Sequence, residues 1–140
     1  DKMKKIGLKE GPHLRDLKEG RSIEIAGKSV NPKDVITIIP GKKLAYVADT
    51  SLCKGGVDLA EDVDIVVSEA TYCHEQEEKA IKHSHLTARQ AAQIASQADA
   101  KKLILTHFSQ RYRTTHDIEE DAKTVFPNVV CAYDFMKIEV

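Results

Sequence analysis

The chain has 140 residues, of which 31% are charged and 41% hydrophobic, and its net charge of −1 is typical of a water-soluble globular protein without overall attraction for nucleic acid. No apolar run approaches the roughly 18 residues of a membrane span, and no secretory signal opens the sequence. Three widely spaced cysteines exclude a disulfide framework and favour a cytoplasmic location.

Residues 1–40 are expected to form a β-rich region built around a hairpin. Alternation of apolar and polar residues predicts its first strand, and a cluster of β-branched residues before Pro40 predicts another. The expected elements are a helix over 12–17, a strand over 22–25, a hairpin turn over 26–29 leading into Val30, a turn over 31–34 and a strand over 35–39.

Residues 41–140 alternate between apolar runs and amphipathic segments, which is typical of a βαβαβ sheet covered by helices. With residues 1–40 they are expected to form a single α/β domain. Ala80 and Ile81 are expected to face inward from their helix. The expected strands are 43–48, 64–67, 103–106, 129–132 and 135–140, and the expected helices are 57–60, 75–82, 88–98 and 117–126.

Polar residues follow three of these strands at the point where each strand ends. They are Asp49, Glu69 and His107, and His85 begins the helix between the last two strands. Ligands bind at the carboxyl ends of strands in open α/β sheets, so we expect these four residues to share one rim. Each alone is also typical of a turn, a helix cap or a satisfied histidine, but together they predict a metal or acid–base site.

Two neighbouring features of this rim leave alternatives open. His83 and His85 could chelate a metal as a pair, but only one of them need face the rim because a helix follows at once. Ser109 and Arg111 follow His107, and their donors suit a substrate phosphate; a solvated basic turn is the alternative.

Seven short segments carry a family resemblance. In order they are IGLKEGP (6–12), LKEG (17–20), ADT (48–50), EAT (69–71), HLTARQAA (85–92), LTHFSQRY (105–112) and AYDF (132–135). This order resembles the C-terminal half of the ribonuclease Z (tRNase Z) family, the tRNA 3′-end processing endonucleases of the metallo-β-lactamase superfamily. The resemblance implies an α/β fold: the second half of an αββα sandwich, with a mixed sheet covered by helices.

The resemblance also implies a role for each residue of the rim. Asp49 resembles a carboxylate that bridges two zinc ions, and His107 a terminal ligand of one of them. His85 resembles the proton donor to the leaving 3′ oxygen, and Glu69 the carboxylate that orients it. The residues that resemble neighbours of the substrate phosphates are Thr87, Ser109 and Arg111.

The sequence departs from the family pattern in two ways. Ala48, Ser68 and Leu86 replace the usual glycine, histidine and serine of three motifs, and Ser68 is expected to weaken the support of Glu69. The HxHxDH motif that supplies most zinc ligands is absent, so the zinc site is expected to be incomplete.

We therefore expect half of a zinc-dependent enzyme that removes the 3′ trailer from tRNA precursors, inactive by itself. Its partners would be the tRNA precursor, the missing N-terminal half of the fold and a second copy in a homodimer. The alternatives are a related phosphodiesterase acting on small substrates, or a non-catalytic half that binds RNA or a partner.

Overall fold

The computed structural model describes residues 11–25 and 27–140. The chain divides into two compact units, Asp1–Gly41 and Lys42–Val140, and each is considered by itself. That the two belong to one domain stays a prediction. The first segment of the family resemblance, 6–12, lies mostly outside the described residues.

The first unit contains a hairpin and two short helices around a small core. Its core consists of buried Leu17 and Ile23, with partly buried apolar residues packed against them. The hairpin is antiparallel and pairs Ile23 with Val30. The elements are α2 (His13–Lys18), β1 (Ile23–Ile25), β2 (Lys28–Val30) and α3 (Pro32–Val35).

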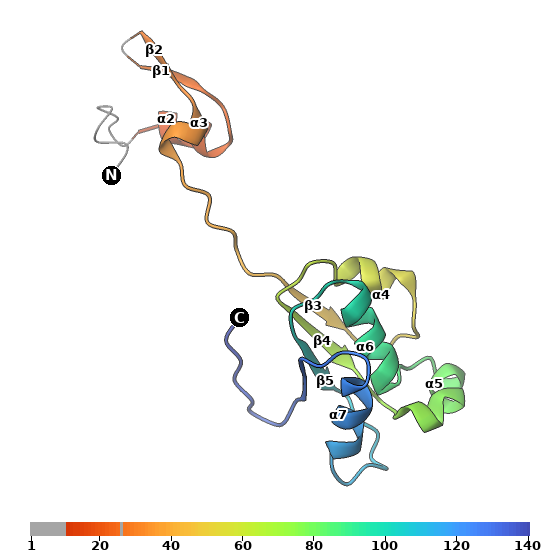
Figure 1. Cartoon of the computed structure of the whole chain (residues 1–140). Helices are drawn as coiled ribbons and strands as arrows, with labels where there is room; N and C mark the ends of the chain where they lie inside the picture. The colour runs from red at the N-terminus through yellow and green to blue at the C-terminus, as the bar shows by residue number, and fades with distance from the viewer. Residues whose placement is uncertain (1–10, 26) are drawn as a thin grey trace. The chain divides into compact units, whose positions relative to one another are not determined.

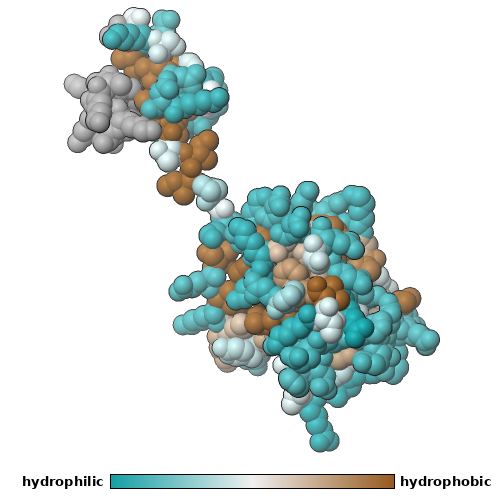
Figure 2. Space-filling view, viewed as in Figure 1, coloured by the Kyte–Doolittle hydropathy of each residue, from teal (hydrophilic) through white to brown (hydrophobic). Residues whose placement is uncertain are grey.

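The predicted strand over 35–39 is wrong. The Asn31 side chain accepts a hydrogen bond from the Lys33 amide at 3.1 Å and caps helix α3, which uses Val35 as its last residue. The chain beyond it pairs with no strand of the described residues, and Ile38 and Ile39 are 87% and 85% exposed. Hydrophobic surface is visible along this segment in Figure 2.

The second unit contains a four-stranded parallel sheet whose strand order, β3-β4-β5-β6, is the order along the chain. Right-handed crossovers between strands in this order place every connecting helix on the same face. Figure 1 shows α4, α6 and α7 on that face. The strands are β3 (Leu44–Val47), β4 (Ile65–Glu69), β5 (Leu103–Thr106) and β6 (Val129–Cys131). The helices are α4 (Lys54–Leu59), the 3₁₀ turn η1 (His74–Gln76), α5 (Glu77–His83), α6 (Ala88–Gln97) and α7 (His116–Lys123).

The main core lies between this sheet and helix α6. Small alanines on the buried side of α6 let the helix approach the strands closely, and Ile94 fills the space that they leave. A Cβ atom added to Gly56 of α4 would lie 3.2 Å from Ile94 Cδ1, so α4 also packs closely on α6. The strand residues that face this core are Ala45, Val47, Val66, Leu103, Leu105, Val129 and Cys131.

The opposite face of the sheet is partly open. Leu44 and Tyr46 of β3 are 57% and 62% exposed on it, whereas Ile65 and Ile104 are buried. The predicted strand over 135–140 is absent, and Phe135 is 99% exposed.

The prediction that Ile81 faces inward is also wrong, because its side chain is 64% exposed while that of Ala80 is buried. Among the described residues, no helix combines the length and hydrophobicity that crossing a membrane would require.

Candidate metal and acid–base site

The carboxyl ends of β3, β4 and β5 bring four predicted site residues together. Asp49 lies two residues beyond β3, Glu69 ends β4, and His107 directly follows β5. His85 reaches the same rim from the loop between α5 and α6. One ligand atom from each of Asp49, His85 and His107 lies within 4.8 Å of the others, so the spacing of these three side chains could accommodate a metal ion.

Two of these residues have a left-handed backbone conformation. Asp49 has a φ of 48° and His107 a φ of 57°, which costs a non-glycine residue about 1 kcal/mol or more. Polar contacts lie at both turns: the Thr50 amide donates to Glu69 Oε1 at 2.7 Å, and Thr71 Oγ1 lies 3.1 Å from the His107 carbonyl oxygen. The surrounding structure therefore holds both side chains at the rim.

The Glu69 carboxylate is fully buried and accepts four hydrogen bonds. Oε1 accepts from the Thr50 amide, and Oε2 accepts from Thr71 Oγ1 at 2.8 Å, His85 Nδ1 at 2.9 Å and the Leu86 amide at 3.2 Å. A buried carboxylate is tolerated only with such partners, and every contact here comes from a donor. Glu69 therefore orients the His85 ring through its Nδ1 atom.

The replacement Ser68 is also buried but takes no part in this set of donors. Its hydroxyl donates to the main-chain carbonyl of Glu69 at 3.0 Å, on the helix-covered side of the strand. The support of the Glu69 carboxylate thus comes from other residues, and the expectation that Ser68 weakens it is not reflected in these hydrogen bonds.

Asp49 faces both histidine rings at distances too long for hydrogen bonds. Its Oδ1 atom lies 3.7 Å from His107 Nε2 and 3.9 Å from His85 Nδ1. Two ligand atoms of one tetrahedral zinc ion, with bonds of about 2.0–2.2 Å, lie about 3.4 Å apart. A carboxylate and imidazoles at this spacing fit a divalent cation of borderline softness. The Asp49 side chain is 75% exposed and that of His107 is 51% exposed, so the group is open on one side.

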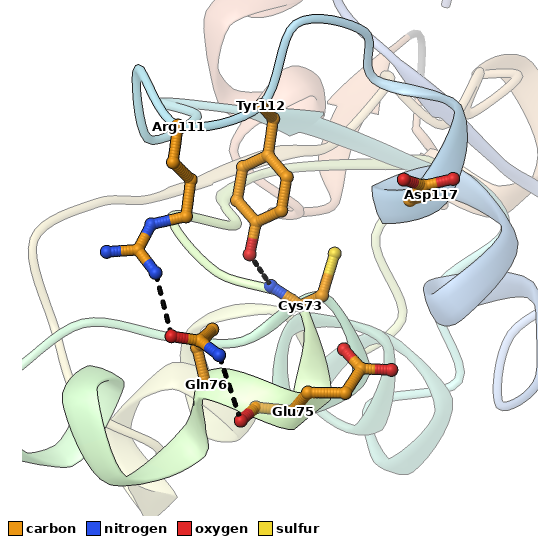
Figure 3. Close-up of a pocket in the computed structure, with 6 residues that line it drawn as sticks. All are labelled: Cys73, Glu75, Gln76, Arg111, Tyr112 and Asp117. Carbon is orange, nitrogen blue, oxygen red and sulfur yellow. Dashed lines mark hydrogen bonds between the residues drawn. The ribbon is translucent and has the colours of Figure 1, made fainter.

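Arg111 lies beside this group in the loop that follows β5. Its Nε atom donates to Ser109 Oγ at 3.2 Å. Its Nη1 atom donates to Gln76 Oε1 at 2.7 Å, a contact drawn in Figure 3. The guanidinium lies 5.1 Å from the centre of the Tyr72 ring, within the range of a cation–π contact. These contacts hold the guanidinium over Tyr72 while leaving it exposed to solvent.

The same loop is tied to the segment after β4. The Ser109 amide donates to the Thr71 carbonyl at 3.1 Å, and the Cys73 amide donates to the Tyr112 hydroxyl at 2.8 Å. Burial raises the pKa of the Tyr112 hydroxyl above its usual value. Figure 3 shows the shallow pocket between the two segments, which Glu75 and Asp117 also line.

Two residues considered from sequence lie outside the group of three. Thr87 is fully buried, and its hydroxyl accepts from the Gln90 amide at 3.2 Å while Gln90 Oε1 accepts from the Thr87 amide at 2.9 Å. This capping box begins α6, and a direct contact of Thr87 with substrate stays a prediction. His83 is exposed at the end of α5.

Sequence reasoning assigned no role to Thr71, although it lies in the segment 69–71. Its hydroxyl contacts Glu69 Oε2, the His107 carbonyl and His107 Nδ1, the last at 3.0 Å. Residues two apart in an extended chain project to the same side, so the spacing of Glu69 and Thr71 was the available signal.

Comparisons with known proteins match this chain to a protein family, to curated sequences and to solved structures. A family model described as "Beta-lactamase superfamily domain" matches residues 17–108. Ribonuclease Z from Crocosphaera subtropica is 36% identical over 100% of this chain and 47% of its own length. Ribonuclease Z from Chlamydia caviae is 41% identical over 96% of this chain and 44% of its own length. The structure of human tRNase Z, short form, aligns with a TM-score of 0.56 and 35% identity, covering 79% of this chain and 36% of that one. The chain thus spans about half the length of the curated relatives it matches.

Proposed function

Because this chain belongs to the β-lactamase superfamily, we propose that it forms one half of a metal-dependent endonuclease that removes the 3′ trailer from tRNA precursors. The observation that carries the proposal is the hydrogen bond of 2.9 Å between buried Glu69 and His85 Nδ1, beside Asp49 and His107. Identities of 36% and 41% to proteins named ribonuclease Z support this choice of reaction over others within the superfamily.

In this proposal Asp49 and His107 would be ligands of two zinc ions. When bound, the ions polarise the phosphate and lower the pKa of a water molecule so that it can attack at neutral pH. Two side chains cannot complete two four-coordinate ions, so the remaining ligands come from the N-terminal half of the fold. The separation of 3.7 Å between Asp49 Oδ1 and His107 Nε2 supports their assignment to a common site.

His85 is the proposed general acid. Its Nδ1–H donates to Glu69, which leaves Nε2 as the ring nitrogen that can deliver a proton. Water adds to the phosphorus, the bond from phosphorus to the 3′ oxygen breaks, and His85 protonates that oxygen. The products are a tRNA with a 3′ hydroxyl and a trailer with a 5′ phosphate, and Glu69 stabilises the charged ring before transfer.

Arg111 is proposed to bind a substrate phosphate with guanidinium donors that its partners do not occupy. Ser109 accepts a hydrogen bond from Arg111 Nε and so supports its position beside the phosphate. Thr87 is proposed to act near the phosphates as well, and its capping of α6 fixes the start of the helix that follows His85.

The open face of the sheet is the proposed docking surface for the N-terminal half. Exposed Leu44 and Tyr46 lie on the face opposite the helices, where an αββα sandwich has its second sheet. The short span of the chain relative to its relatives supports this occupant. We propose that the complete enzyme is a cytoplasmic homodimer, and the free thiols of Cys53, Cys73 and Cys131 suit a reducing compartment.

Cleavage of a tRNA precursor with a 3′ trailer by the full-length enzyme, beside a small phosphodiester substrate, tests the proposal. We expect a cut at the tRNA 3′ end by the full-length enzyme and none by this chain alone. His85→Ala should lower the cleavage rate by about 100-fold or more with metal content retained, the usual scale for a general acid.

His83→Ala is the matched control, because it removes a histidine two residues away that lies outside the metal-binding group. It should cleave like the unchanged enzyme. Cleavage of the small substrate without any cut at the tRNA 3′ end would contradict the proposed substrate. Loss of metal in His85→Ala would contradict the role of His85 as a proton donor.

A further inference from the structure

We propose that Thr71 is a positioning residue whose hydroxyl fixes the Nδ1-protonated tautomer of His107 and thereby turns the lone pair of Nε2 toward Asp49. This inference rests on the metal site of the proposed function. It assigns a role to a residue that contacts neither the substrate nor the metal in that proposal.

The Thr71 hydroxyl has a single proton to donate. Thr71 Oγ1 lies 2.8 Å from Glu69 Oε2 and 3.1 Å from the carbonyl oxygen of His107, and both of these atoms can only accept. The hydroxyl can therefore donate its proton to only one of these two oxygens. It donates to Glu69 Oε2, because the carboxylate is the closer and stronger acceptor. The third neighbour, His107 Nδ1 at 3.0 Å, must then be the donor.

This assignment fixes the other side of the ring. A neutral imidazole with its proton on Nδ1 carries a lone pair on Nε2, the atom 3.7 Å from Asp49 Oδ1. Two acceptor atoms then face each other at a distance that suits two ligands of one cation. With the opposite tautomer, the Nε2 proton would instead point at Asp49, and a metal could bind there only after this proton had left.

Burial makes the hydroxyl difficult to replace. Thr71 is 7% exposed and Glu69 is fully buried, so the environment restricts water from taking over the same three contacts. Glu69 Oε2 accepts from both Thr71 and His85, so the hydroxyl also supports the orientation of the second histidine. Hydrogen-bonding partners of metal-binding histidines are typically worth 10–100-fold in metal affinity.

Two variants separate the hydroxyl from the shape of the side chain. Thr71→Val keeps the volume and removes the oxygen, whereas Thr71→Ser keeps the oxygen and removes a methyl group. Thr124→Val is the matched control, since the Thr124 hydroxyl donates to the Asp121 carbonyl on helix α7 and has no contact with the site.

The experiment measures the His107 tautomer by nitrogen NMR in the metal-free chain at mildly alkaline pH. The zinc affinity is measured by competition with a chelator in the full-length enzyme, which supplies the remaining ligands. We expect the Nδ1-protonated form in the unchanged chain and in Thr71→Ser. Thr71→Val should lose this preference and bind zinc about 10–100-fold more weakly. Thr124→Val should match the unchanged chain in both measurements.

An Nε2-protonated ring in the unchanged chain would overturn the inference, as would unchanged zinc affinity in a folded Thr71→Val. If Thr71→Val does not fold, the tautomer of the unchanged chain and the behaviour of Thr71→Ser decide the question, because loss of the tautomer in Thr71→Ser would assign the effect to the methyl group. Neither readout needs catalysis, so failure of tRNA cleavage would contradict the proposed function while leaving this inference standing.

Discussion

Replacing Glu69 by glutamine tests whether the buried carboxylate organises the rim. In the unchanged chain it accepts four hydrogen bonds, two of them from main-chain amides. Glutamine has an NH₂ group in place of one carboxylate oxygen. The orientation that disturbs the fewest contacts places this NH₂ group at the position of Oε1, so that it faces the Thr50 amide at 2.7 Å. The other oxygen then keeps its three donors but loses its charge.

These contacts determine how much stability the substitution Glu69→Gln should cost. An unsatisfied buried amide costs about 1–3 kcal/mol, and changing the contact with His85 from charged to neutral costs about 1 kcal/mol more. We therefore expect Glu69→Gln to lower the free energy of unfolding by about 2–4 kcal/mol. Urea unfolding of the chain, followed by far-ultraviolet circular dichroism, measures this difference.

The control is Glu61→Gln, which makes the same chemical change at an exposed residue without a side-chain hydrogen bond among the described residues. It should stay within about 0.5 kcal/mol of the unchanged chain. Equal stability of Glu69→Gln and Glu61→Gln would refute the reasoning, because it would mean that the four donors do not depend on the carboxylate.

Two further predictions concern Tyr112, which is partly buried, and Cys131, which is buried. Tyr112→Phe removes the acceptor of the Cys73 amide and should lower the free energy of unfolding by about 1–2 kcal/mol, whereas Tyr133→Phe, at a residue that is 70% exposed, should have little effect; similar urea midpoints for the two variants would contradict this. Burial raises the pKa of Cys131 to about 11, from a usual value of 9.0. The protonated Cys131 thiol should therefore contribute its full share of the free energy of unfolding below about pH 9, and this share should be lost as the pH rises through about 11. In Cys131→Ala, the free energy of unfolding should decline less steeply across this range. Parallel curves for the two proteins would contradict the assignment.

Sequence correctly predicted the strand over 22–25 with its hairpin in the first unit, and the four strands of the sheet in the second unit. Continuous apolar runs such as Leu103–Thr106 bury their side chains only inside a covered sheet. The structure places these runs there as β3 to β6. The predicted strands over 35–39 and 135–140 failed for a common reason. Composition reports a preference for extended backbone, but a strand also needs a neighbour to pair with, and neither segment has one among the described residues.

Part of the candidate site could also be predicted from the sequence, and part could not. The meeting of Asp49, Glu69, His85 and His107 follows from parallel strands that end at one edge, which is a property of topology and can be read from chain order. The contacts of Thr71 depend on side-chain rotamers and on a left-handed turn at His107, so they could not be derived from spacing alone. The capping role of Thr87 could have been predicted, because Thr-x-x-Gln at the start of a helix is the sequence pattern of a capping box.

The strand order of the second unit has a consequence for how its sheet can form. Each strand pairs with the strand that precedes it in the chain, so no pairing has to wait for a segment made much later. The sheet can therefore grow by addition at one edge, so that each step closes a single connection and loses the entropy of that connection alone. Such an order of assembly allows Lys42–Val140 to acquire its fold during synthesis, one strand at a time.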